Sequence, residues 1–501
     1  MREKLPNPTE RLAALTEIVS GFAERRILCV GDVMLDRFIY GGVKRISPEA
    51  PVPIINVTRE HSELGGAGNV LRNLVALGAR NFFVSVVGDD DAGGDVGKLL
   101  GALDKAEYYL CDGSGRETTI KTRFFSQHNH HLLRADKETV EPLSSADIAD
   151  LERVITSQIN TVDAVVLSDY GKGVLNGSLS SFIIAAASKA GKPTVVDPKG
   201  VDYHRYKGAS VLTPNRAELE QVTGGPVNTE GAIVDAAQTL RAAAKVSAVL
   251  VTRSGDGMTL VEADGAKHML ATTREVADVT GAGDTVVATL ALALACGASL
   301  SDAAYLANAA AGVVVARHGT AAVSTPDITA AVLHDGLAHA EQKIVDRATA
   351  GARAKSWREK KLKIGFTNGC FDLLHPGHVS LLRQAREACD RLIVGLNSDL
   401  SIQRLKGAGR PVQNEMARAA VMASLAPVDL VVVFGEDTPM GLISALRPDV
   451  LVKGADYART DVVGGDFVEG YGGRVVLVDV IGPYSTTATI AAMNSAQKVK
   501  I

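Results

Sequence analysis

The chain has few cysteines and little net charge. Five cysteines occur among 501 residues, with no Cys-x-x-Cys pair: Cys29, Cys111, Cys296, Cys370 and Cys389. This odd number and irregular spacing fit neither a disulfide framework nor a zinc site, so we expect reduced thiols. The net charge of -4 gives no overall attraction to nucleic acid or to an anionic membrane, and we expect neither as a partner.

The sequence also lacks a long hydrophobic run. Residues 1–6 have no apolar segment typical of a secretory signal. The most apolar stretches, Leu290–Ala298 and Ala303–Ala316, are too short or too interrupted to span a bilayer. These absences predict a cytoplasmic globular protein. Its length exceeds that of one ordinary hydrophobic core, so we expect two or more domains.

In the first two thirds of the chain, short apolar runs alternate with helical patterns. Continuous apolar strands that alternate with helices predict an α/β fold with a mostly parallel sheet covered on both faces. Two segments break this rhythm, Arg37–Val57 and Glu117–Arg134, and we expect them to form a small β lid. The predicted sheet strands are Ile27–Val30, Phe82–Val87, Ala164–Leu167, Thr194–Val196, Val211–Leu212 and Ala248–Val251.

A second β/α series begins at Lys363. The preceding segment, Arg347–Lys363, holds seven Lys or Arg residues against one Glu, which is typical of a solvated linker or helix face. We therefore predict one domain over 1–335, a linker over 336–360 and a second domain over 361–501. The strands predicted for the second domain are Ile364–Phe366, Leu392–Leu396, Leu430–Phe434, Val450–Val452 and Val475–Val480.

The motif Gly281-Ala282-Gly283-Asp284 precedes an apolar helical segment. Its glycines let backbone amides approach a ligand, and the start of a helix attracts a phosphoryl group through free N–H donors and partial positive charge. A carboxylate there would accept the proton of an incoming hydroxyl. The alternative is a tight glycine turn with Asp284 as a helix cap, and a single motif of this kind favours the turn.

Three further motifs favour phosphoryl transfer. An aspartate after the first strand would hold a polyol, and a Gly-Gly-x-x-Asn turn would admit a sugar against the backbone. An Asn-x-x-Glu element would hold hydrated Mg²⁺ near phosphates, or would form a helix capping box. The residues of these motifs are Asp36; Gly65, Gly66 and Asn69; and Asn215, Arg216, Ala217 and Glu218.

In this order and spacing the motifs resemble those of the ribokinase-like (PfkB) sugar kinases over about residues 20–330. The resemblance implies a ribokinase-like domain, with Asp284 as the catalytic base and Gly281, Ala282 and Gly283 as the anion hole. It also implies Mg²⁺ with ATP, no metal cage made by protein alone, and a homodimer through the kinase lid. The chain departs from the family at Val286, where many members carry Phe.

The second motif is His375-Pro-Gly-His378, which follows a strand and should enter a helix. Two imidazoles three residues apart project to one side and can donate hydrogen bonds to a nucleoside triphosphate as charge builds on its phosphate oxygens. A zinc site is one alternative, but no third ligand has a suitable spacing. A capped turn is another.

Residues around this motif supply polar groups that suit phosphate binding. Lys406 should lie in a flexible basic loop with Arg410, and Lys453 at a strand end. Ser485, Thr486 and Thr487 should precede a helix, where hydroxyls and free amides hold phosphate. For each of these, the alternative is a surface charge or a helix cap.

This constellation resembles the HxGH cytidylyltransferase-like nucleotidyltransferases over about residues 360–501. The resemblance implies a Rossmann-like domain in which His375 and His378 stabilise the triphosphate. It also implies nucleotide binding by Asn368, Gly369, Phe371, Asp372, Lys406, Lys453, Ser485, Thr486 and Thr487.

The pair of domains is similar to a bifunctional heptose enzyme family of Gram-negative bacteria. The resemblance implies ATP-dependent phosphorylation of D-glycero-β-D-manno-heptose 7-phosphate at O1. It then implies AMP transfer from ATP to heptose 1-phosphate, which gives ADP-heptose for the lipopolysaccharide core and releases pyrophosphate. The alternative is another sugar-phosphate kinase fused to a CTP-dependent cytidylyltransferase. The sequence leaves open which cation holds the 7-phosphate, the candidates being Arg45, Lys121, Arg123, Arg134 and Lys172.

Overall fold

The computed structural model describes residues 8–113, 115–128, 130–175, 178–272, 277–317, 321–407, 409–455 and 458–479. The chain divides into two compact units. The larger is Ala13–Val332, and the smaller comprises Leu333–Ile501 with Met1–Leu12. The limits of 335 and 360 drawn from the sequence remain a prediction.

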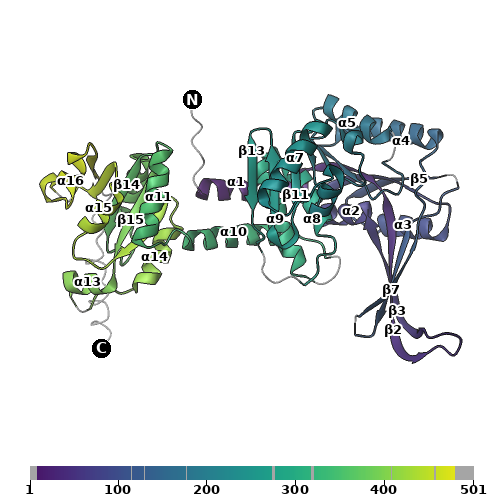
Figure 1. Ribbon diagram of the computed structural model, residues 1–501, viewed down its shortest axis with the longest axis horizontal. Coiled ribbons are helices and arrows are strands. Elements are labelled where there is room, and N and C mark those ends of the chain that lie inside the picture. Colours follow the sequence, from purple (N-terminus) through teal and green to yellow (C-terminus); the bar gives the residue numbers. More distant parts are fainter. Residues whose placement is uncertain are drawn as a thin grey trace. The chain divides into compact units, whose positions relative to one another are not determined.

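The larger unit is built on a nine-stranded sheet within the described ranges (Figure 1). Neighbouring strands are parallel except at the β11–β12 and β12–β13 pairs. The six strands predicted for this unit are confirmed. In spatial order the strands are β13 (Gly265–Met269), β12 (Met258–Glu262), β11 (Ala248–Thr252), β10 (Val211–Leu212), β9 (Thr194–Asp197), β8 (Ala164–Ser168), β1 (Arg26–Gly31), β4 (Arg80–Val87) and β5 (Ala106–Asp112).

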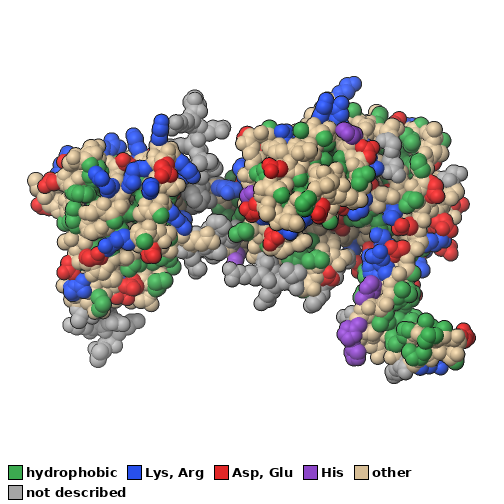
Figure 2. Space-filling view, viewed as in Figure 1, with side chains coloured by type: hydrophobic (Ala, Val, Ile, Leu, Met, Phe, Trp, Pro, Cys, Tyr) green, Lys and Arg blue, Asp and Glu red, His purple; other side chains and the backbone are tan. Residues whose placement is uncertain are grey.

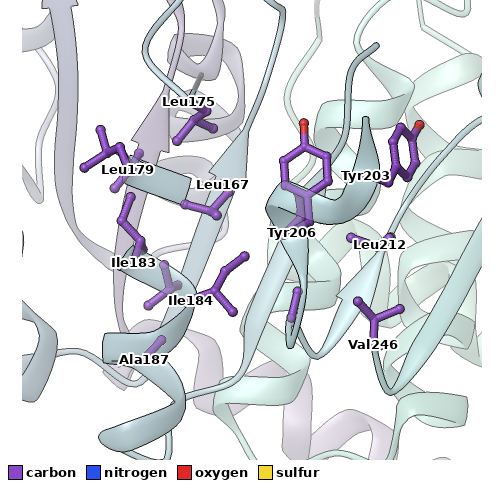
Figure 3. Packing of buried hydrophobic residues seen from close by; sticks show 14 of the residues in the cluster. Leu167, Leu175, Leu179, Ile183, Ile184, Ala187, Tyr203, Tyr206, Leu212 and Val246 are labelled. Carbon is purple, nitrogen blue, oxygen red and sulfur yellow. The ribbon is translucent and has the colours of Figure 1, made fainter. Parts of the chain in front are cut away.

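Helices cover both faces of this sheet, which explains the continuous apolar runs of its central strands. Figure 3 shows part of one face, where Leu167 of β8 packs near Leu179 and Ile183. Each such buried side chain contributes about 1.5–3 kcal/mol to folding. One face carries α4 (Ser145–Gln158), α5 (Leu179–Lys189), α6 (Arg216–Thr223) and α7 (Glu230–Ala244), and the other carries α2 (Ala67–Ala76), α8 (Ala282–Ala295) and α9 (Leu300–Val315).

The remaining helices of this part of the chain lie outside these two groups. Helix α3 contacts β5 and the strands β2 and β3. The other two, α1 and α10, each contain a boundary between the two units. The bounds of these three helices are α1 (Pro8–Ser20), α3 (Asp91–Gly101) and α10 (Thr325–Glu341).

A second, four-stranded sheet forms the lid, as predicted, and projects from the main sheet in Figure 1. Strands β2 and β6 run parallel, whereas β2–β3 and β6–β7 are antiparallel. Pro48 and Pro51 lie in the turn that joins β2 to β3. In spatial order the lid strands are β3 (Pro53–Gly66), β2 (Val33–Ile46), β6 (Ile120–Ser126) and β7 (His131–Lys137).

The smaller unit has a five-stranded parallel sheet in its described part, typical of a Rossmann-like domain. The first four predicted strands are confirmed. The fifth is confirmed as Arg474–Val478, and residue 480 lies outside the described residues. The strands are, in spatial order, β16 (Leu430–Phe434), β15 (Arg391–Asn397), β14 (Ile364–Gly369), β17 (Val450–Gly454) and β18 (Arg474–Val478).

Helices also cover both faces of this smaller sheet. Helix α11 includes much of the basic segment assigned to a linker, yet its Ala350 and Ala354 are fully buried in the core. Its Lys355 and Arg358 are exposed, so the basic run is one face of a packed helix. The helices are α11 (Arg347–Glu359), α15 (Met440–Leu446) and α16 (Gly465–Gly470) on one face, α12 (Pro376–Glu387) and α14 (Glu415–Ser424) on the other, and α13 (Asp399–Lys406) after β15.

In the nine-stranded sheet and in the five-stranded sheet, the strand order reverses once. Strand β1 lies between β8 and β4, and β14 lies between β15 and β17. Ligands bind at the carboxyl ends of strands at such reversal points in open α/β sheets. The motif with His375 follows β14, and the loop that leads to Asp36 in the lid follows β1, so these two segments lie at places where the fold favours a site. In the described ranges, no helix has the length and apolar character needed to cross a membrane.

Candidate functional site

Asp284 lies in the first turn of α8 and is only 7% exposed. Its Oδ2 accepts a hydrogen bond from Asn69 Nδ2 at 2.5 Å, and its Oδ1 accepts one from Tyr170 Oη at 2.6 Å. Burial raises the pKa of Asp284 to about 6, although both hydrogen bonds oppose this rise. The group is therefore ionised at neutral pH with a pKa suited to a general base.

Gly281 begins α8 and fixes the approach to Asp284. Its φ of 77° lies in the left-handed region, and a Cβ at this position would lie 2.8 Å from Asn69 Nδ2. A larger residue would therefore strain the backbone and displace Asn69. The first amides of a helix have no intrahelical partner. The Ala282 amide donates to the Val279 carbonyl oxygen at 3.3 Å, which leaves the amides of Gly281 and Gly283 to bind an anion.

These residues line a cavity of about 430 Å³ that also includes Asn215 and Glu218. Both residues form a capping box at the start of α6. Asn215 Oδ1 accepts from Glu218 N at 2.9 Å, and Asn215 N donates to Glu218 Oε2 at 3.0 Å. The capping alternative therefore holds, and the same two side chains border the cavity. Arg216 donates to Asp256 at 2.6 Å, and Ala217 lies in the first turn of α6.

Four carboxyl groups line this cavity, those of Asp169, Asp197, Glu218 and Asp284. Asp169 pairs with Arg205 at 3.1 Å. Burial raises the pKa of Asp197 well above its usual value, and the negative charges of Asp284 and Glu218 raise it further. Lys199 pairs with Glu218 at 2.8 Å. This excess of negative charge fits a cation that arrives with a nucleotide. Among the described residues, no cluster of three or more His, Cys, Asp and Glu could hold a metal ion by itself.

Asp36 lies where β2 leaves the main sheet and is 8% exposed. Its Oδ1 accepts a hydrogen bond from Arg123 Nη1 at 2.7 Å. A Cβ on Gly65 would lie 2.5 Å from Asp36 Oδ2, and one on Gly66, whose φ is 58°, would lie 2.5 Å from the Asp32 carbonyl oxygen. The negative charge of Asp36 also raises the pKa of Asp284, so the two carboxylates lie within electrostatic reach of each other.

Sequence reasoning missed Asp32 and Tyr170. Asp32 is 1% exposed and accepts hydrogen bonds from the amides of Tyr170, Lys172 and Val174 at 2.8–3.0 Å. It thereby fixes the loop after β8 and presents the Tyr170 hydroxyl to Asp284. Asp32 and Tyr170 each lie just after a buried strand of a parallel sheet. This position in the sequence could have marked them as candidate site residues.

The second site contains His375 and His378 at the start of α12. Their ring centroids are 3.7 Å apart and the rings are inclined by 24°, so the imidazoles lie on one side as expected. Burial lowers the pKa of His378 to about 4, with further lowering by His375 and Lys406, and burial also lowers that of His375. Both rings are therefore neutral at pH 7, and each has one N–H donor and one acceptor.

Buried polar atoms without partners gather at the carboxyl end of β14. Among the described residues these include Thr367 Oγ1, Asn368 Oδ1 and His375 Nδ1. Buried polar atoms normally have hydrogen-bond partners, so this group suits a bound ligand. Lys453 Nζ donates to the Asn368 carbonyl oxygen at 3.0 Å, which places an ammonium beside the same strand end.

The loop between β14 and α12 is shaped by Gly369 and Phe371. A Cβ on Gly369 would lie 3.1 Å from the Phe371 ring. Phe371 has a φ of 43° and its ring lies 5.1 Å from that of His378. This packing supports the orientation of the imidazole pair.

The prediction that Lys406 and Arg410 lie in a flexible basic loop is wrong in part. Lys406 is the last residue of α13, and Arg410 donates to buried Asp372 at 2.6 Å. Asp372 also accepts from the amides of Val412 and Gln413 at 2.8 and 3.2 Å. Burial alone would raise the pKa of Asp372, but these hydrogen bonds lower it below its usual range. Asp372 therefore holds the loop in place, while Lys406 is exposed.

The predicted phosphate-binding residues Ser485, Thr486 and Thr487 lie outside the described residues. Their assignment stays a prediction.

Arg418 of α14 is a further residue that sequence reasoning missed. Its side chain is completely buried and donates to the carbonyl oxygens of Cys370 at 2.7 Å, Asn397 at 2.9 Å and Gln413 at 3.0 Å. It also pairs with Asp399 at 2.6 Å. One guanidinium thus joins three segments around the second site.

We expect Arg418→Met to lower the unfolding free energy of the smaller unit by about 3 kcal/mol, because three carbonyls and one carboxylate lose their partner. Arg404 provides a matched control, since it is half exposed and pairs with Asp437 at the surface. Arg404→Met should cost less than about 1 kcal/mol. Urea unfolding of both variants measures the difference, and equal losses would contradict a structural role specific to Arg418.

Comparison with known proteins finds relatives for both halves of the chain. Residues 24–328 match the pfkB family of carbohydrate kinases, and residues 366–496 match the cytidylyltransferase-like family. The bifunctional protein HldE of Rhodospirillum rubrum is 57% identical over 97% of this chain and 98% of its own length. The bifunctional protein HldE of Paramagnetospirillum magneticum is 55% identical over 96% of this chain and 99% of its own.

Solved structures resemble the larger unit. Phosphofructokinase-2 from Escherichia coli in complex with potassium has a TM-score of 0.52 at 21% identity, covering 62% of this chain and 98% of that one. The same enzyme in complex with substrates and products has a TM-score of 0.51 at 20% identity, with the same coverage. At this identity the likeness establishes the ribokinase-like fold.

Proposed function

The chain belongs to the family of bifunctional HldE proteins, and from this premise we propose how its two sites divide the work. It is an ATP-using heptose kinase and adenylyltransferase of ADP-heptose synthesis. The observation that carries the division is the presence on one chain of a buried carboxylate in a cavity and of a stacked imidazole pair at a second sheet reversal.

In the first reaction Asp284 is the general base. It accepts the proton of the heptose 7-phosphate O1 hydroxyl while O1 bonds to the γ-phosphorus of ATP and the bond from that phosphorus to ADP breaks. The amides of Gly281, Ala282 and Gly283 hold the transferred phosphoryl group, because they lie at a helix start, where N–H donors and partial positive charge favour an anion. Asp36 and Asn69, which border Asp284, hold the sugar.

The carboxylates of Asp197 and Glu218 suit Mg²⁺ that accompanies ATP, since a cation relieves their mutual repulsion. Asn215 fixes Glu218 through the capping box. When bound, Mg²⁺ would neutralise charge on the phosphates. Nucleotide binding by the Asn215–Glu218 turn is part of this proposal.

In the second reaction an oxygen of heptose 1-phosphate attacks the α-phosphorus of ATP, and the bond to pyrophosphate breaks. His375 and His378 donate hydrogen bonds to the phosphate oxygens, whose charge grows as the bond forms. Lys406 adds positive charge near these imidazoles, and Lys453 adds it at the end of β14. Asn368, Gly369, Phe371 and Asp372 shape the nucleotide pocket at the end of β14, and Ser485, Thr486 and Thr487 contribute phosphate contacts.

The direct test is incubation with heptose 7-phosphate, ATP and Mg²⁺, with and without a phosphatase that removes the 7-phosphate, followed by mass measurement. We expect heptose 1,7-bisphosphate without the phosphatase and ADP-heptose with it. CTP in place of ATP in the second step tests the alternative of a cytidylyltransferase. A CDP-sugar as the preferred product would contradict the adenylyl assignment.

The kinase should lose activity in acid, with its kcat/KM falling below about pH 6 as Asp284 becomes protonated. Tyr170→Phe should move this acidic limb to higher pH by about one unit, because the variant lacks a hydrogen bond that stabilises the ionised carboxylate. Substrate phosphates titrate equally with both proteins, so the difference between the two profiles isolates Asp284. Coincident profiles would contradict the role of Asp284 as the base.

The lid is also the proposed contact of a homodimer. Hydrophobic side chains gather over the end of the lid in Figure 2. Ile46 is 61% exposed, Val52 51% and Val57 50%. Burying such a patch would stabilise a dimer, and sedimentation over a range of concentrations tests it.

We place the enzyme in the cytoplasm, where ATP and reduced thiols both occur.

A further inference from the structure

Four cations lie near the base of the lid, and three of them have ion-pair partners. Figure 2 shows Lys and Arg side chains gathered where the lid joins the main body. The pairs are Arg123 with Asp36 at 2.7 Å, Arg134 with Asp136 at 3.0 Å and Lys172 with Glu138 at 2.7 Å. The fourth cation, Lys121, has no ion pair with any described residue.

Lys121 lies on the face of the lid that carries Asp36. It is in register with Asp36 on β2 and with Asp136 on β7. Arg123, two residues further along β6, reaches Asp36, and residues two apart on a strand share a face. The Lys121 side chain therefore lies beside the carboxylate proposed to hold the sugar.

The surroundings of Lys121 suit an anionic ligand. Its side chain is about half buried, and burial lowers its pKa, as do the positive charges of Lys172 and Arg134, while Asp36 and Asp136 oppose this. The four cations face three carboxylates, which leaves one positive charge without a partner. A partly buried charge without a partner costs folding free energy, which a bound anion would offset.

Two other cations are badly placed for the same role. Arg45 is nine residues beyond Asp36 along β2, roughly 30 Å at the rise of a strand, which exceeds the length of one sugar phosphate. Lys199 is paired with Glu218 on the nucleotide cavity. That cavity contains no lid residue, so nucleotide and lid approach Asp284 from different sides.

We propose that the Lys121 ammonium binds the phosphate monoester of the sugar substrate, at the end remote from the reacting hydroxyl. The proposal rests on the proposed kinase function and names the group that selects its substrate. A sugar with its reacting hydroxyl at Asp284 and further hydroxyls at Asp36 extends along the lid toward Lys121. There a dianionic phosphate meets the cation of this group of four that has no ion pair among the described residues, and a neutral sugar gains nothing.

The test is Lys121→Met, assayed as full-length protein with heptose 7-phosphate and with the same heptose lacking the phosphate. For the phosphorylated sugar we expect KM to rise about 10- to 100-fold with little change in kcat, because one charged hydrogen bond is lost. For the unphosphorylated sugar, kcat/KM should match that of the parent protein. Lys121→Arg keeps the charge and should retain the low KM.

Lys137→Met is the matched control, because Lys137 is an exposed lid lysine that pairs with Glu117 at 2.9 Å. It should leave both substrates unaffected. An unchanged KM in Lys121→Met, an equal rise in Lys137→Met, or equal losses on both sugars would each overturn the proposal. If Lys121→Met does not fold, a high KM in Lys121→Arg relative to Lys137→Arg would overturn it instead. Failure of the parent protein to phosphorylate heptose 7-phosphate would contradict the proposed function itself.

Discussion

Asp284→Asn is expected to lower kinase turnover by about 10²- to 10⁴-fold, because a general base typically contributes that factor. The amide keeps the shape of the carboxylate but cannot accept the proton of the sugar hydroxyl. Its effect should appear in kcat, measured as ADP release in the presence of heptose 7-phosphate. Adenylyl transfer to heptose 1-phosphate should continue at the parental rate, since Asp284 belongs to the larger unit.

Asp278→Asn is the matched control for this variant. Asp278 lies just before the Gly281–Asp284 motif, but it accepts hydrogen bonds from Thr280 N at 2.9 Å and Thr280 Oγ1 at 2.7 Å and thus holds a local turn. The control should stay close to parental kinase activity. Substantial ADP release by Asp284→Asn would remove the assigned base, and a parallel loss of adenylyl transfer would indicate general misfolding.

His378→Ala is expected to lower adenylyl transfer by about 10²- to 10³-fold, which is the typical cost of removing one positioned donor from a transition state. The stacked pair at 3.7 Å would lose one ring, and His375 would lose its packing partner. Pyrophosphate release from ATP and heptose 1-phosphate measures the effect. His378→Asn retains a side-chain N–H and should lose less.

The kinase activity of His378→Ala should be unchanged, because the ring lies in the smaller unit. Loss of both activities together would contradict independent sites. Full adenylyl transfer in the alanine variant would show that the imidazole pair has no part in the reaction.

The central strands were predictable because burial on both faces leaves a continuous apolar run in the sequence. Strand β12 is also buried, and it was missed because Thr259 interrupts its short apolar run. Strands β5 and β13 were missed because they are not fully buried. They lie toward the edges of the sheet, where burial is incomplete: Tyr108 of β5 is 40% exposed, and most of β13 is exposed. The lid was recognised because its strands interrupt the β/α rhythm, although its strand order required the structure.

The motifs revealed the candidate reacting groups but not the residues that hold them. Tyr170 contacts Asp284 across 114 residues of sequence, and Asp32 binds the Tyr170 amide across 138. No local pattern records such contacts. Arg418 has the sequence appearance of a surface helix cation, yet the loops around β14 bury it completely. Arg410 was expected in a flexible basic loop and instead pairs with buried Asp372.

The most direct test of two independent sites on one chain is a mixing experiment with Asp284→Asn and His378→Ala. Each variant alone, given heptose 7-phosphate, ATP, Mg²⁺ and the phosphatase, should form almost no ADP-heptose. The mixture should form it, because one variant supplies the kinase and the other the adenylyltransferase. If ADP-heptose is not detected by mass in the mixture while the parent protein makes it, the account is contradicted. Asp284 and His378 would then not act in two independent reactions.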